Sequence, residues 1–135
     1  MKSTVLDSYA VLAFLFKETG HEKVVELFEK AAEADKLLLI AAPNWAEVRY
    51  MVERKVGANR WQEVRTKLLN LPLDIVSADQ VLAEAAGEIK VSHKMSLADC
   101  FAAALAKQRK LEIYTGDPEF KKLEKNISIH WILDA

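Results

Sequence analysis

The chain has 135 residues, of which 51% are hydrophobic and 29% charged, a balance typical of one folded domain rather than of a disordered segment. Its 19 Lys and Arg residues are matched by 20 Asp and Glu residues, and this balance excludes a general polycation that coats nucleic acid. One cysteine excludes an internal disulfide, and no apolar run approaches the roughly 20 residues that cross a bilayer, so we expect a cytoplasmic protein without membrane contact.

Short apolar segments alternate along the chain with segments of helical periodicity. The predicted strands comprise residues 3–6, 37–41, 73–76, 112–115 and 128–132. The predicted helices begin near Tyr9, His21, Pro43, Asn59, Ser77, Ser96 and Pro118. We expect Gly20 to end the first helix, and Ser77 with Gln80 to form a capping box at the start of the fifth.

This alternation predicts an α/β fold with a mainly parallel central sheet of about five strands, flanked by helices on both faces. No linker, repeat or low-complexity segment interrupts the pattern, so we expect a single domain over residues 1–135. The helix that Ser96 opens is rich in alanine, which would let it lie close to the sheet. Cys100 in this helix is expected to be a buried thiol that packs as a small hydrophobic group.

Four carboxylates fall where predicted strands pass into helices, the edge at which α/β sheets form their binding crevice. Asp7 follows the first strand and Asp117 the fourth, while Glu47 and Asp99 are expected in the first turns of their helices. Each acid by itself can be explained as part of a helix cap, since Asn44 and Ser96 lie three residues before Glu47 and Asp99.

Together, the four acids point to metal chemistry. Carboxylates gathered in a half-buried crevice repel one another, and some become protonated unless a cation is present. Oxygen ligands with water at the remaining positions suit Mg²⁺ or Mn²⁺. Such an ion can activate water against a phosphodiester bond.

The segments that carry these acids are Val5-Leu6-Asp7-Ser8, Glu47 at a helix opening, Ser96–Ala106 and Tyr114–Phe120. In this order they resemble the PIN-domain family, and more narrowly the VapC-type toxins of toxin–antitoxin pairs, from about Thr4 to Trp131. The resemblance implies a Mg²⁺- or Mn²⁺-dependent endoribonuclease that hydrolyses RNA with metal-activated water.

Carried onto this sequence, the acidic quartet of the family is Asp7, Glu47, Asp99 and Asp117. The hydroxyls of Ser8 and Thr115 match positions beside the acids, where they would orient ligands or water. The resemblance also implies a homodimer and a VapB-like antitoxin whose C-terminal segment lies in a groove and can place a basic residue among the acids.

Arg49, Arg54 and Lys94 are candidates for contact with the RNA backbone, because positive charge gathers in the segments that contain them. The alternative for these residues is a solvated face, since Glu53 and Glu63 are interspersed with the basic residues.

Other functions remain open at this point. They are a PIN nuclease of RNA processing, a flap-type DNA nuclease, and a catalytically inactive PIN scaffold that only binds a partner. A signalling receiver domain is excluded, because Asp7 has no acidic neighbour and Asp74 lies inside a predicted strand. A dinucleotide-binding domain is disfavoured, because none of the four glycines forms a phosphate-binding turn.

Overall fold

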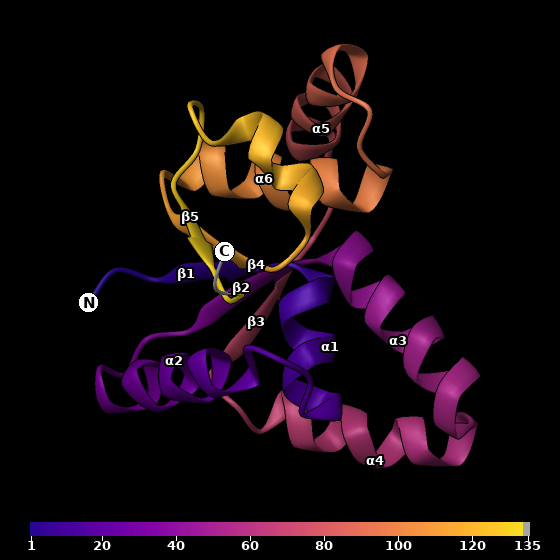
Figure 1. Cartoon of the computed structure of the whole chain (residues 1–135). Coiled ribbons are helices and arrows are strands. Elements are labelled where there is room, and N and C mark those ends of the chain that lie inside the picture. The colour runs from indigo at the N-terminus through magenta and orange to yellow at the C-terminus, as the bar shows by residue number, and fades with distance from the viewer. Residues whose placement is uncertain (134–135) are drawn as a thin grey trace.

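The computed structural model describes residues 1–133, and residues 134 and 135 of the predicted domain lie outside the described part. Its centre is a five-stranded sheet, parallel throughout, in the order β3-β2-β1-β4-β5 (Figure 1). The strands are β1 Thr4–Leu6, β2 Leu38–Ala41, β3 Leu73–Val76, β4 Glu112–Thr115 and β5 Ile129–Trp131. The predicted α/β class, the strand number and the parallel pairing are confirmed.

Helices cover both faces of the sheet (Figure 1). They are α1 Ser8–Phe16, α2 His21–Glu33, α3 Ala42–Val56, α4 Ala58–Leu69, α5 Gln80–Ser92, α6 Leu97–Arg109 and the 3₁₀ helix η1 Pro118–Leu123. One hydrophobic core lies under α1 to α4, and the other lies between the sheet and α5, α6 and η1. Among residues 1–133, no helix is long and apolar enough to cross a membrane.

Three helix boundaries differ from the prediction. The first helix ends at Phe16 because Lys17 adopts the left-handed conformation, and Gly20 instead begins α2. The fifth helix has Asp79 as its cap, because the Asp79 carboxylate accepts the Leu82 N–H at 2.8 Å; the predicted Ser77 capping box is wrong.

The third correction concerns α3. Strand β2 runs directly into this helix with the extended residue Ala41 as its cap, so Asn44 lies inside the helix and is fully buried. The proposed Asn44 cap is therefore wrong. Glu47 lies in the second turn of α3 rather than the first, and a capping role does not account for it.

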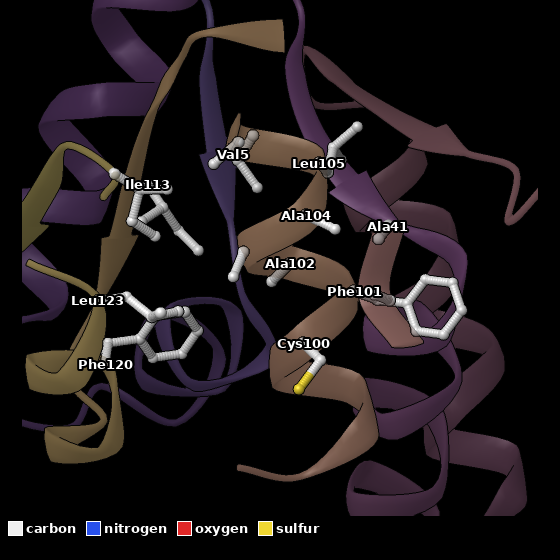
Figure 2. Close-up of a cluster of buried hydrophobic side chains, with 14 of the residues drawn as sticks. Val5, Ala41, Cys100, Phe101, Ala102, Ala104, Leu105, Ile113, Phe120 and Leu123 are labelled. Atoms are coloured by element: carbon white, nitrogen blue, oxygen red, sulfur yellow. The ribbon is translucent and has the colours of Figure 1, made fainter. Parts of the chain in front are cut away.

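The alanines of α6 form one wall of the second core. Ala102, Ala103 and Ala104 are buried in the core cluster that also contains side chains of β1 and β4, and Figure 2 shows α6 running beside these strands. Cys100 is fully buried in the same helix, as expected. Because the methyl groups are short, the helix axis approaches the sheet closely, and this approach brings the first turn of α6 to the carboxyl ends of the strands.

We expect Ala102→Leu to destabilise the protein by about 1–3 kcal/mol, because the added side-chain atoms have no space beside β1. The matched change Gln108→Leu, at an exposed position of the same helix, should leave the free energy of unfolding nearly unchanged. Urea denaturation of both variants measures the difference. Equal stability of the two variants would contradict close packing of α6 on the sheet.

Candidate active site

Asp7 lies at the carboxyl end of β1 and is fully buried. Its Oδ1 accepts the N–H of Ala10 at 2.9 Å, which caps α1, and its Oδ2 accepts the hydroxyl of Thr115 from the end of β4. The same Thr115 oxygen accepts the N–H of Asp117 at 3.0 Å. One hydrogen-bonded chain therefore joins the ends of the two central strands and positions both Asp7 and Asp117.

Burial changes the acidity of two of the carboxyl groups. Removal from water raises the pKa of Asp7 to about 8, although the hydrogen bonds from Thr115 and Ala10 act in the opposite direction. Burial also raises the pKa of Asp99 to about 7, and repulsion from the Asp117 carboxylate adds to this effect. Without a cation, both groups therefore hold a proton for part of the time near neutral pH.

Glu47 reaches the same region from α3, the helix that follows β2, and β2 is the neighbour of β1 in the sheet. Its Oε1 accepts the hydroxyl of Ser8, and its Oε2 accepts the hydroxyl of Tyr50 at 3.1 Å. Two donors thus hold the carboxylate in a single orientation. Tyr50 was not among the predicted site residues; the signal for it is its position three residues after Glu47, on the same face of a helix.

Asp99 lies in the first turn of α6, where the Oγ of Ser96 accepts its N–H at 3.1 Å, so the predicted Ser96 cap is confirmed. Asp117 caps η1 by accepting the N–H of Glu119 at 2.9 Å. These acids share a cleft of about 360 Å³. The cleft is lined by Ser8, Tyr9, Leu12, Glu47, Met51, Ser96, Asp99, Asp117 and Glu119.

The structure thus brings three of the four predicted acids to one cleft. Asp7, the fourth, is buried next to them, within electrostatic range of Asp99 and Asp117. Ser8 contacts Glu47, and Thr115 contacts Asp7 and Asp117, so both predicted hydroxyls lie beside the acids.

The sequence predicted no site role for five residues that line the cleft, which are Tyr9, Leu12, Met51, Ser96 and Glu119. Tyr9 lies in the first turn of α1, and its side chain is 38% exposed. Its ring packs against Gly116, where an added Cβ would lie 2.3 Å from Tyr9 Cε1. A side chain at this position would require the Tyr9 ring to move.

The candidate RNA-contact residues lie outside the lining of the cleft. Arg49 pairs with Glu53 at 2.6 Å and lies over the ring of the buried Trp61. The guanidinium of Arg54 lies 4.8 Å from the centre of the Tyr50 ring, which connects it to Glu47 through one side chain. Lys94 belongs to the segment before α6, and its carbonyl accepts the Lys122 ammonium.

The donor set of the cleft suits a hard divalent cation. It consists of carboxylate and hydroxyl oxygens, and no Lys or Arg among the described residues lines the cleft to balance them. Among residues 1–133, no three His, Cys, Asp or Glu side chains are arranged closely enough to hold a metal ion as they stand. Burial, the main cause of the raised pKa values of Asp7 and Asp99, disfavours their ionised forms, and a cation bound among the acids would offset this effect.

Comparisons with known proteins agree with this arrangement. The sequence matches the family described as PIN domain over residues 4–126. Ribonuclease VapC30 of Mycobacterium tuberculosis is 30% identical over 110 residues, which cover 76% of this chain and 81% of that protein.

Solved structures share the fold. In the structure of DNA-bound VapBC from Salmonella typhimurium, the matching chain superposes with a TM-score of 0.77 at 19% identity, covering 98% of this chain and 99% of that one. The structure of VapC20 from Mycobacterium tuberculosis, described as a sarcin-ricin loop cleaving toxin, has a TM-score of 0.66 at 19% identity and covers 89% and 94% of the two chains.

The raised pKa of Asp7 predicts a pH dependence of stability. Between the ordinary Asp pKa of 3.8 and about 8, folded Asp7 keeps a proton that the unfolded chain has released. The metal-free protein should therefore lose stability as the pH rises through this range, and Asp7→Asn should reduce the loss. Urea denaturation in EDTA at several pH values measures it, with the exposed Asp74→Asn as control. An equal slope in wild type and Asp7→Asn would contradict the assignment.

The contact between Gly116 and Tyr9 predicts a coupled pair of substitutions. Gly116→Ala should cost about 1–3 kcal/mol of stability, because the new methyl group overlaps the Tyr9 ring. In a Tyr9→Ala background the same substitution should cost much less, since the ring is gone. A double-mutant cycle measured by urea denaturation tests this, and additive effects of the two changes would contradict it.

Proposed function

Because this chain belongs to the PIN-domain family, as a VapC-type member, we propose that it is a Mg²⁺- or Mn²⁺-dependent endoribonuclease and the toxin of a toxin–antitoxin pair. The observation that carries the proposal is the convergence of Glu47, Asp99 and Asp117 on one cleft, with Asp7 buried beside it. The name of the 30% identical relative, a ribonuclease, supports the reaction. The description of VapC20 as a toxin that cleaves the sarcin-ricin loop supports RNA as the substrate.

In this proposal Asp7, Asp99 and Asp117 hold the metal ion, directly or through water, and Glu47 completes the cluster. A bound Mg²⁺ or Mn²⁺ lowers the pKa of water and offsets the charge that develops on the phosphate. The hydrogen bonds from the Ala10 N–H and the Thr115 hydroxyl keep the Asp7 carboxyl group in one orientation, so its remaining lone pairs have a fixed direction. Asp99 and Asp117 are fixed in turn by the caps of α6 and η1.

Glu47 is the best placed residue to accept a proton from the attacking water. Ser8 and Tyr50 each donate to one of its oxygens, which orients the carboxylate and still leaves a lone pair free on each oxygen. In-line attack of this water on the phosphorus would break the bond between phosphorus and O3′, leaving 3′-hydroxyl and 5′-phosphate ends.

We further propose that the RNA backbone approaches over α3, where Arg54 packs on the ring of Tyr50, and that Arg49 and Lys94 add contacts to the backbone. A VapB-like antitoxin is the expected inhibitor, and the similarity to a chain of the Salmonella VapBC assembly supports this partner. A homodimer and a cytoplasmic location complete the proposal.

The deciding experiment is cleavage of labelled total RNA by the purified protein with Mg²⁺, Mn²⁺ or EDTA. We expect cleavage with either metal and none with EDTA. Asp99→Asn should lower the rate of cleavage by more than the roughly 10- to 100-fold that is typical when a hydrogen-bond partner of a metal ligand is removed. The matched variant Asp74→Asn, on an exposed strand position, should cleave like the wild type. Intact RNA with both metals, from folded protein free of antitoxin, would favour an inactive scaffold or a DNA nuclease.

A further inference from the structure

The acidic cleft contains few groups that could bind a phosphate directly. Four of its lining side chains are carboxylates, Glu47, Asp99, Asp117 and Glu119, which only accept hydrogen bonds when ionised. A phosphodiester is also an acceptor and an anion. Beyond the positive charge of a metal ion, its non-bridging oxygens need hydrogen-bond donors from the protein.

Three residues that line the same cleft carry a hydroxyl group, and the hydroxyls of two of them already have partners. Ser8 donates its hydrogen to Glu47, and Ser96, whose Oγ accepts the N–H of Asp99 as the cap of α6, also stabilises the Asp99 carboxylate through a side-chain hydrogen bond that lowers its pKa. Within residues 1–133, the third hydroxyl, that of Tyr9, makes no hydrogen bond. It is therefore the uncommitted donor in the lining.

The position of Tyr9 is well defined. The residue lies in the first turn of α1, two positions after Asp7, and its ring packs against Gly116 next to Asp117. Its hydroxyl is within electrostatic range of the carboxyl groups of Glu18, Asp117 and Asp7. A Lys or Arg in this place would form ion pairs with the acids and compete with a metal ion, whereas a neutral phenol leaves the carboxylates available.

We propose that Tyr9 contacts the substrate, donating its hydroxyl hydrogen to a non-bridging phosphate oxygen of the RNA strand in the cleft. This inference rests on the proposed ribonuclease function and adds a catalytic residue outside the acidic quartet. The contact between the ring and Gly116 holds the donor at the rim of the cleft before substrate arrives, which reduces the entropy lost on binding.

The test compares Tyr9→Phe with Tyr114→Phe. Both changes remove one phenolic oxygen and keep the ring, but Tyr114 lines a different cavity at the opposite ends of the strands. The RNA is an oligonucleotide that spans a cut mapped in total RNA. We expect Tyr9→Phe to lower kcat/KM about tenfold or more, the factor for one hydrogen bond to a charged group, and Tyr114→Phe to match the wild type. Thermal unfolding checks that both variants fold.

A second readout separates contact from a structural role. Sulfur accepts hydrogen bonds poorly, so a phosphorothioate at the mapped cut should slow the wild type for the diastereomer whose sulfur faces Tyr9. The slowing for that diastereomer should shrink in Tyr9→Phe, which has no hydrogen bond to lose. Unchanged kcat/KM in Tyr9→Phe, or a lower value with an unchanged thio effect, would overturn the contact and leave the ribonuclease intact. Absence of any cleavage by the wild type would overturn the proposed function first, and the Tyr9 contact with it.

Discussion

Burial of the Asp7 carboxyl group between β1 and β4 is the constraint on which the site depends. A carboxyl group without water must obtain its hydrogen bonds from the protein, and here they come from the α1 backbone and from Thr115. Meeting this requirement fixes the start of α1, the end of β4 and, through the Thr115 oxygen, the N–H of Asp117. The parallel pairing of β1 with β4 makes the arrangement possible, because it brings both carboxyl ends to the same edge of the sheet.

The same burial links stability to ligand chemistry. Removal from water and mutual repulsion disfavour the ionised forms of Asp7 and Asp99, so the folded protein keeps its acids together at an energetic cost. A divalent cation among them would offset that cost, and its binding would favour the ionised forms. A site that is unfavourable when its acids are ionised without a cation is therefore suited to hold one.

The two faces of the sheet supply different parts of the cleft. On one face the small side chains of α6 let the helix approach the strands, so that Asp99 lies at the sheet edge. On the other face β2 passes into α3 without a loop, so the helix begins before Asn44. Glu47 therefore lies in the second turn, where its carboxylate accepts hydrogen bonds from Ser8 and Tyr50. Tyr9 packs on Gly116 at the rim, where the elements after β1 and β4 meet.

The sequence alone determined the α/β class, the approximate strand positions and the four acids, because period-two and period-3.6 patterns and the junctions between strands and helices are local properties. It could not place the start of α3, since Asn44 has the residue type and spacing of a cap but is buried inside the helix. Nor could it identify Tyr9 as a cleft residue, because its apolar neighbours suggested the core. Only the tertiary structure decided which face of α1 meets the sheet, how closely Gly116 approaches the Tyr9 ring and which hydroxyls are already bonded. The physical reason is that each of these depends on contacts between segments far apart in the chain.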